Sequence, residues 1–385
     1  MQKIISLVGA RPNFMKIAPF VRAIENYNKV NSDKLDHILV HSGQHYDVRM
    51  SKSFFDALGI PDPDINLEIG SGSHAEQVGK TMIEFERVLK NENPDWVIVV
   101  GDVNAILAGS VTAKKLRIKC AHIEAGLRSG DLTMPEEINR LVADRICDLL
   151  LTPDKISKKN LQREGVPEEK IKFVGNIMID TLEANRKKAE KLDINMIVSR
   201  NSFIENTTHK FENSAFAVMT MHRPSNVDSR EILSRIILFL TKEMVQNMPL
   251  IWPIHPRTHK RLIEFGLWDK VMNTDNLIIL HPIGYQEMLR LNMGAKIFLT
   301  DSGGIQEECT VLGTPCLTLR WNTERPITLR EHGGASVLVG NNIERIKKEF
   351  SNILSSFSKP IRPEKWDGKT ANRIVKEIVN FSGVH

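Results

Sequence analysis

The sequence predicts an α/β protein with two Rossmann-like domains that face a central cleft. Short apolar runs alternate with amphipathic helical patterns, which indicates βαβ units and parallel sheets. This alternation occurs twice, on either side of a charged and polar stretch at residues 186–214. The chain has 385 residues, enough for two domains that each bury a core.

The first domain is expected to contain at least five strands, and helical patterns follow them. Apolar residues from Ile138 to Leu149 recur at steps of three and four, so a helix is expected to begin near Pro135. The expected strands are 4–8, 37–42, 95–100, 119–124 and a run beginning at 148, and the other expected helices are 15–24, 51–59 and 105–116.

The second domain repeats the pattern, and a final amphipathic helix is expected to pack back on the first domain. Its expected strands are 215–220, 250–255, 277–282, 295–300, 315–320 and 336–340. We place the boundaries so that the domains are 1–176 and 177–365, with the returning helix in 366–385.

Composition excludes several classes of function. The net charge is only +5 and no long basic run occurs, so no nucleic-acid partner is expected. No apolar stretch approaches the ~20 residues that cross a bilayer. The four cysteines form no CxxC pair and fit a reducing cytoplasm. HPRTH (255–259) has zinc-like spacing, but a proline interrupts it and a third ligand is missing, so no metal is expected.

Carboxylates follow two successive expected strands. Ligands of open parallel sheets bind beyond the carboxyl ends of the strands, where Asp102 and Glu124 stand. Glu136 and Glu137 follow Pro135 in the first turn of the next helix, where acids are favourable for purely local reasons. Convergence of several carboxylates would separate their pKa values, as acid/base chemistry requires.

TDSGGIQEE (300–308) resembles an anion site at a helix start. Ser302, Gly303 and Gly304 would let the backbone approach a phosphate, whose charge the helix N-terminus favours. Glu308 lies about one turn, ~5 Å, along the helix, which suits a ribose diol. The structural alternative is an ordinary capped helix whose glycines serve tight packing.

Three further residues each have more than one possible role. Arg11, after the first strand, fits a phosphate clamp or a surface ion pair. His222, after a strand of the second domain, could contact phosphate, donate a proton or cap a helix. Trp321 could stack on a ligand or pack in the protein interior.

GSGSHA (70–75) lacks the ribose-binding acid of a dinucleotide site, so no nicotinamide cofactor is expected.

Together, these motifs resemble the non-hydrolysing UDP-N-acetylglucosamine 2-epimerases, which have a fold like that of GT-B glycosyltransferases. The segments GARPNFMKIAP, GDVNA, HIEAGLRSGDLTMPEEINR, HRPSN, TDSGGIQEE and RWNTERP match in order and spacing. The resemblance implies interconversion of UDP-GlcNAc and UDP-ManNAc through a 2-acetamidoglucal, without a cofactor. It assigns catalysis to Asp102, Glu124, Glu136 and His222, and UDP binding to Arg11, Lys16, His222, Ser302, Gly303, Gly304, Glu308 and Arg325.

The resemblance also implies a cytoplasmic homodimer acting on a UDP-N-acetylaminosugar, and two departures qualify it. QHYD (44–47) replaces the QHRE segment that the family connects with activation by a second UDP-GlcNAc. RPSN follows His222 where others carry a glutamate, which fits a subfamily acting on diacetamido-uronic or 6-deoxy UDP-aminosugars. A hydrolysing 2-epimerase, a glycosyltransferase on the same fold and a non-catalytic nucleotide-sugar sensor are the alternatives.

Overall fold

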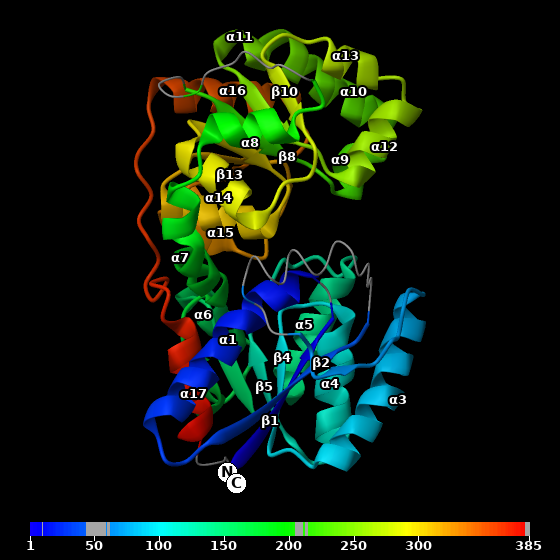
Figure 1. Ribbon diagram of the computed structural model, residues 1–385, viewed down its shortest axis with the longest axis vertical. Coiled ribbons are helices and arrows are strands. Elements are labelled where there is room, and N and C mark those ends of the chain that lie inside the picture. The colour runs from blue at the N-terminus through cyan, green and yellow to red at the C-terminus, as the bar shows by residue number, and fades with distance from the viewer. Residues whose placement is uncertain (10, 44–58, 60–61, 205–210, 212–214, 382–385) are drawn as a thin grey trace. The chain divides into compact units, whose positions relative to one another are not determined.

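The chain folds into two compact α/β units. The computed structural model describes residues 1–9, 11–43, 59, 62–204, 211 and 215–381, without the side chains of Arg11 and Pro12. The first unit consists of Met1–Ala184 and Glu364–His385, and the second of Asn185–Pro363. Each unit has a sheet covered by helices (Figure 1). The predicted fold class, α/β with two Rossmann-like units, is confirmed.

The sheet of the first unit is entirely parallel and has the order β3-β2-β1-β4-β5-β6-β7. Its strands are β1 (Gln2–Val8), β2 (Leu35–His41), β3 (Ile65–Asn66), β4 (Trp96–Val100), β5 (Lys119–Ile123), β6 (Leu149–Thr152) and β7 (Ile171–Phe173). The helices that begin in this unit are α1 (Arg11–Val30), α3 (His74–Glu92), α4 (Asn104–Lys115), α5 (Pro135–Ile146), α6 (Lys155–Arg163), α7 (Ile177–Glu190) and α17 (Thr370–Val379), with a 3₁₀ turn η1 (Glu168–Lys170).

The sheet of the second unit is also parallel, with the order β10-β9-β8-β11-β12-β13. Its strands are β8 (Ala217–Thr220), β9 (Leu250–Pro253), β10 (Leu277–Leu280), β11 (Ile297–Thr300), β12 (Cys316–Thr318) and β13 (Ser336–Leu338). Its helices are α8 (Ile194–Asn201), α9 (Pro224–Val227), α10 (Arg230–Phe239), α11 (Val245–Asn247), α12 (Pro256–Glu264), α13 (Trp268–Met272), α14 (Tyr285–Gly294), α15 (Gly303–Leu312) and α16 (Ile343–Ser355), with a π turn η2 (Leu240–Met244) and 3₁₀ turns η3 (Pro326–Thr328) and η4 (Arg330–His332).

Both sheets have the reversal of strand order at which ligands bind in this architecture. The order reverses between β1 and β4 in the first sheet, and between β8 and β11 in the second. The strands there are continuous buried apolar runs, as parallel strands covered on both faces must be. Ligands of such sheets bind beyond the strand carboxyl ends at the reversal. Asp102 follows β4, whereas His222 and Ser302 follow β8 and β11.

The C-terminal segment belongs to the first unit, where α17 packs against α1 (Figure 1). Asp180 of α7 accepts hydrogen bonds from the backbone N–H groups of Thr370 (3.0 Å) and Ala371 (2.7 Å), so it caps α17. The buried indole of Trp366 donates to the carbonyl of Pro153 at 2.9 Å. The sequence placed the first boundary at 176, whereas the contacts divide the chain after Ala184, within α7.

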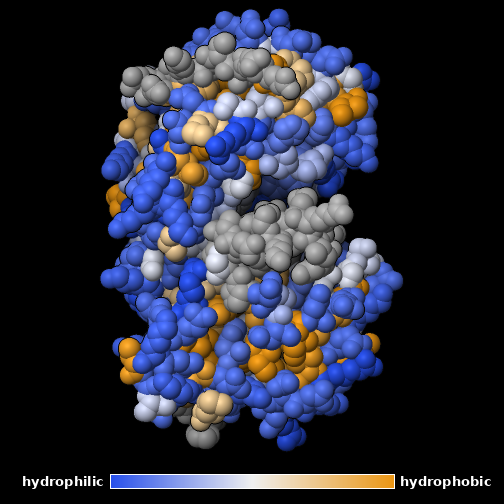
Figure 2. Space-filling view, in the orientation of Figure 1, coloured by the Kyte–Doolittle hydropathy of each residue, from blue (hydrophilic) through white to orange (hydrophobic). Residues whose placement is uncertain are grey.

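The viewed surfaces of both units are mainly hydrophilic, and hydrophobic side chains show between the helices of the first unit (Figure 2). Among the described residues, no helix combines the length and the hydropathy needed to span a bilayer. QHYD (44–47), on which the expected change in activation depends, lies outside the described residues, as does most of the helix expected at 51–59.

Candidate active site

A buried ion pair stands at the carboxyl end of the first sheet. Lys16 projects from α1, and its Nζ lies 2.6 Å from Oε2 of Glu124, which follows β5. The neighbouring Asn13 anchors α1 by donating to the carbonyl of Val100 at 2.8 Å. A Cβ on Gly101 would lie 3.0 Å from Lys16 Nζ and 3.8 Å from Glu124 Oε2. A side chain at position 101 would therefore crowd the ion pair, and glycine avoids this conflict.

Glu124 itself has an unusual backbone. Its φ of +74° is in the left-handed region, which costs a non-glycine residue of the order of 1 kcal/mol or more. The N–H groups of Glu124 and Ala125 both donate to the carbonyl of Leu151, at 3.1 and 3.2 Å, and hold this conformation. Backbone strain of this kind is often found where a side chain must be aimed at a ligand.

A second network joins Asp102 to the start of α5. Arg140 is buried, and its Nη1 donates to Asp102 Oδ2 at 2.5 Å while its Nη2 donates to Glu137. Glu137 also accepts the N–H groups of Ser129 (3.0 Å) and Gly130 (2.9 Å). Burial raises the pKa of Glu137, but these bonds outweigh it, and the pKa lies below its ordinary value. Glu137 is thus an ionised anchor of the loop after β5.

The structure treats the two adjacent glutamates differently. Glu137, which the sequence favoured as a simple helix-start charge, is the buried loop anchor. Glu136 is half-buried, and no hydrogen bond or ion pair connects it to any described residue. Strand pairing places Asp102 and Glu124 at one edge, because Val100 of β4 pairs with Ile123 of β5.

In the second unit, Asp301 orients His222. Asp301 is fully buried and accepts the N–H groups of His222 (3.0 Å) and Arg223 (2.8 Å) and the amide of Asn226 (3.1 Å). His222 Nδ1 lies 3.0 Å from Asp301 Oδ1. Burial raises the pKa of Asp301, but the bonds from His222 and Arg223 hold it below its ordinary value. Among the described residues, none hydrogen-bonds to the other ring nitrogen, Nε2, and the His222 side chain is 39% exposed.

An arginine lies against the glycines at the start of α15. Arg325 Nε donates to Glu307 at 2.7 Å, and its Nη1 donates to Glu324. A Cβ on Gly303 would lie 2.9 Å from Arg325 Nη1, so glycine permits this close approach. Burial raises the pKa of Glu324, but Arg325 and Arg320 outweigh it, and the pKa is strongly lowered. This buried network holds a cation at the helix N-terminus.

Of two expected anion ligands, Ser302 has its N–H group already engaged, and Arg11 has a side chain outside the described structure. The N–H of Ser302 is already bonded to Thr300 Oγ1 at 3.0 Å, whereas those of Gly303 and Gly304, in the first turn of α15, have no intrahelical acceptor. Arg11 begins α1, but its side chain is outside the described structure.

Glu308 is a buried carboxylate on α15 and has an unused oxygen. Its Oε2 has no hydrogen-bond partner within the part of the chain that the structure describes. Burial, together with the charge of Glu307, raises its pKa to about 7, against the opposing effect of the Tyr285 hydroxyl. An unsatisfied buried acceptor is costly unless a ligand supplies donors. The two hydroxyls of a ribose would supply them.

The residues that sequence reasoning missed are Arg140, Asp301 as the partner of His222, and the network of Glu307, Arg320 and Glu324. Arg140 stands three residues after Glu137, a spacing that places two residues on one helix face and could have indicated the pair. Nothing in the local sequence indicates the partners of Arg325, because loop closure brings them together.

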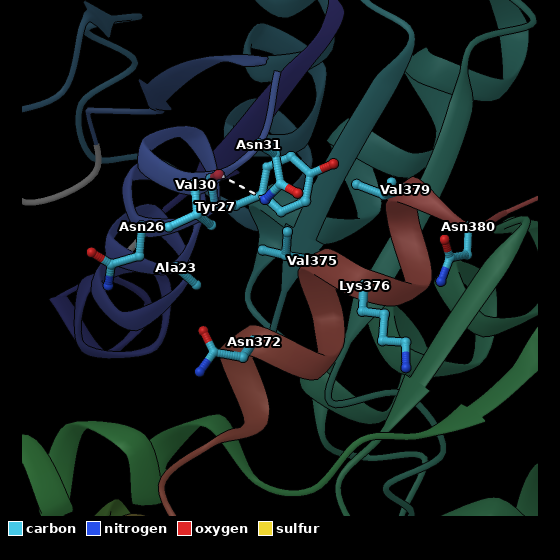
Figure 3. A pocket seen from close by; sticks show the side chains of 10 residues that line it. All are labelled: Ala23, Asn26, Tyr27, Val30, Asn31, Asn372, Val375, Lys376, Val379 and Asn380. Atoms are coloured by element: carbon cyan, nitrogen blue, oxygen red, sulfur yellow. Dashed lines mark hydrogen bonds between the residues drawn. The ribbon is translucent and has the colours of Figure 1, made fainter. Parts of the chain in front are cut away.

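A groove of about 650 Å³ lies elsewhere in the first unit, between α1 and α17. Its walls are mostly carboxamide and apolar side chains, including Asn26, Tyr27, Asn372 and Val375 (Figure 3). None of the candidate residues lines it. The described residues also contain no cluster of three metal-binding side chains. The candidate functional residues are therefore those at the strand ends of each unit, and not those that line this groove.

Comparison with known proteins gives concordant matches. A family model described as UDP-N-acetylglucosamine 2-epimerase matches residues 28–379. The UDP-N-acetylglucosamine 2-epimerase of Methanocaldococcus jannaschii is 44% identical, with 97% of this chain and 98% of that one covered. The crystal structure of the M. jannaschii enzyme in complex with UDP-GlcNAc and UDP matches with a TM-score of 0.85, 42% identity and coverage of 98% and 99%. The UDP-2,3-diacetamido-2,3-dideoxy-D-glucuronate 2-epimerase of Pseudomonas aeruginosa is 38% identical over 88% of both chains.

Proposed function

Because the chain belongs to the UDP-N-acetylglucosamine 2-epimerase family, we propose that it inverts C2 of a UDP-N-acetylaminosugar, interconverting UDP-GlcNAc and UDP-ManNAc. The observation that carries the proposal is the pair of carboxylates at neighbouring strand ends, Asp102 and Glu124, each held by its own buried cation. An isomerase at C2 needs a base and an acid at one ring carbon, and two positioned carboxylates can provide them.

The second unit is assigned the grip on UDP. The N–H groups of Gly303 and Gly304, at the positive end of the α15 dipole and beside the guanidinium of Arg325, suit the diphosphate. Glu308, with its unused buried oxygen, accepts the ribose hydroxyls. His222, oriented by Asp301, stabilises or protonates the leaving phosphate oxygen. Arg11, Ser302 and Lys16 complete the UDP assignments, and Lys16 in addition holds Glu124.

The reaction proceeds by elimination and re-addition. The C2 hydrogen of the sugar is not next to a carbonyl, so its direct removal is too difficult. Cleavage of the C1–oxygen bond releases UDP and leaves an oxocarbenium-like C1, which acidifies the C2 proton. A carboxylate takes that proton and yields a 2-acetamidoglucal. Protonation of C2 on the opposite face and attack of UDP on C1 give the epimer, and no redox cofactor takes part.

The modified-sugar alternative is supported by one specific relative. The P. aeruginosa protein, named for a diacetamido-glucuronate substrate, is 38% identical, whereas the M. jannaschii UDP-GlcNAc enzyme is 44% identical. Assaying both sugar nucleotides with the same preparation decides between them. We expect turnover of UDP-GlcNAc. Turnover of only the diacetamido sugar would instead identify the protein as a 2-epimerase of diacetamido UDP-sugars.

Product analysis separates the remaining alternatives. Chromatography after incubation with UDP-GlcNAc should show UDP-ManNAc. Free ManNAc with UDP would identify a hydrolysing 2-epimerase, and a transferred sugar would identify a glycosyltransferase. Binding of both sugar nucleotides without turnover of either would identify a sensor. We also propose a cytoplasmic homodimer, and light scattering after gel filtration should give twice the chain mass of 43.6 kDa.

A further inference from the structure

His122 and Asp144 form a buried pair between the loops that carry the two carboxylates. His122 is on β5, and its Nδ1 lies 2.6 Å from Asp144 Oδ1 of α5. Its Nε2 lies 2.8 Å from the carbonyl oxygen of Gly101, the residue before Asp102. We propose that this pair is a positioning device that fixes the loops of Asp102 and Glu124 for proton transfer at the sugar, an inference that rests on the proposed function.

Hydrogen bonding uses both nitrogens of the His122 ring. A carbonyl oxygen can only accept, so Nε2 carries a proton toward Gly101. Burial raises the pKa of Asp144, but His122 and Arg128 outweigh it, and the pKa lies below its ordinary value. The 2.6 Å separation of Nδ1 and Asp144 Oδ1 is that of a hydrogen bond, so His122 joins the two loops through both of its ring nitrogens.

The other oxygen of Asp144 holds the loop after Glu124. Asp144 Oδ2 accepts the N–H of Gly126 at 2.9 Å and Nη1 of Arg128 at 2.7 Å. Gly126 has a φ of +83°, and a Cβ there would lie 2.3 Å from the carbonyl oxygen of Ser157, so only glycine fits. Asp144 thereby fixes the segment immediately after the strained Glu124.

On the other side, His122 fixes the segment before Asp102. Gly101 also has a positive φ, +78°, so its carbonyl has a direction that an ordinary strand end would not give it. His122 is fully buried and Asp144 is 2% exposed, so neither reaches a ligand directly. They act only through the residues that they hold. Gly126, held by Asp144, is two residues after Glu124, and Gly101, held by His122, is next to Asp102.

Kinetics of Asp144→Asn test the proposal, with Asp148→Asn as the matched control. Asp148 lies at the opposite end of β5, where it accepts the N–H of Cys120 at 2.8 Å. It also accepts Nζ of Lys114, on α4, at 2.7 Å. We expect Asp144→Asn to lower kcat by ~100-fold, the effect of misplacing a catalytic group by about 1 Å, with unchanged UDP affinity. Asp148→Asn should keep the kcat of the parent. Normal kcat in Asp144→Asn, or equal losses in both variants, would overturn the proposal.

Nitrogen-15 NMR of histidine-labelled parent protein tests the geometry without any activity assay. The bond to the carbonyl of Gly101 predicts a directly bonded, slowly exchanging hydrogen on His122 Nε2. His122→Gln identifies the signals by their loss, and Asp144→Asn should shift the Nδ1 signal. A His122 Nε2 without a bonded hydrogen would overturn the inference even if the enzyme epimerises its substrate. A bonded hydrogen on His122 Nε2 together with an absence of epimerisation would instead count against the proposed function.

Discussion

Lys16 Nζ lies 2.6 Å from Glu124 Oε2, and the two side chains are 7% and 3% exposed. This pair connects the first helix of the chain to the end of the strand that carries a candidate acid/base residue. A buried charge that loses its partner destabilises a protein strongly, whereas loss of both charges is tolerated much better. The pair can therefore be tested through stability as well as through catalysis.

Lys16→Met should destabilise the protein by about 3–5 kcal/mol, because it leaves Glu124 charged and buried. Glu124→Gln in the same background removes that charge, so the double variant should regain most of the lost free energy of unfolding. Urea titration of the parent, both single variants and the double variant measures the coupling. Additive losses would show that the two residues act independently.

Glu136→Gln should impair catalysis, whereas Glu137→Gln should impair stability. Glu136 has no bonded partner among the described residues, so its amide should fold normally but lower kcat by at least ~100-fold, the scale of acid/base groups. Glu137→Gln removes a carboxylate that holds Arg140 and two loop N–H groups, so the melting temperature should fall. Steady-state kinetics and thermal melts separate the outcomes. Normal turnover in Glu136→Gln would return that residue to a helix-start charge.

These two glutamates show where sequence reasoning reached its limit. Composition and spacing predicted acids in the first turn of α5, but successive helix positions point in directions about 100° apart. The path of the preceding loop decides which side chain is buried, and a single sequence does not encode that path locally. Arg140 was missed for the same reason, because its bond to Asp102 joins residues 38 apart.

The fold was more predictable than the site. Continuous apolar runs such as 96–100 and 297–300 became central strands, because burial on both faces demands them. The missed strands, β3 and β7, have two and three residues at the sheet edges, too short to produce a hydrophobic pattern. The helix expected at 15–24 extends over Arg11–Val30, because Asn13 anchors its start to the carbonyl of Val100 and the helix packs against α17.

Gly303→Ala should weaken UDP binding by roughly tenfold or more. The added methyl would lie 2.9 Å from Arg325 Nη1 and 3.0 Å from Glu324 Oε1, so it must displace the cation from the start of α15. Isothermal titration with UDP measures the loss. Gly79→Ala in α3 is the control, since no atom lies within 4 Å of its added Cβ. Equal UDP affinity in the two variants would contradict the phosphate assignment.

Glu308 should make UDP affinity depend on pH. Its pKa of about 7 in the free protein means that the carboxyl is protonated below that pH. Ribose hydroxyls donate to the ionised form, so UDP affinity should rise as the pH increases from 6 to 8. Glu308→Gln should bind UDP more weakly at pH 8 and lose this part of the pH dependence. An identical profile in parent and variant would remove Glu308 from the ribose site.

The same residue gives a stability prediction with a definite sign. A carboxyl whose folded pKa is raised from 4.5 to about 7 stabilises the fold below pH 4.5, and this contribution is lost as the pH rises through 7. Glu308→Gln should therefore make the ligand-free protein more stable at pH 8, by up to roughly 3 kcal/mol. Thermal melts at pH 5 and pH 8 test this, and a gain at pH 5 but not at pH 8 would reverse the predicted sign.

Proton NMR of UDP-GlcNAc incubated with the protein in D₂O tests the central claim most directly. Elimination and re-addition at C2 predict that UDP-ManNAc appears and that the C2 proton signal of both sugars disappears as deuterium replaces it. The Glu124→Gln variant at the same concentration should show neither change at a comparable rate. Conversion with full retention of the C2 proton, or no conversion and no exchange by the parent protein, would contradict the account.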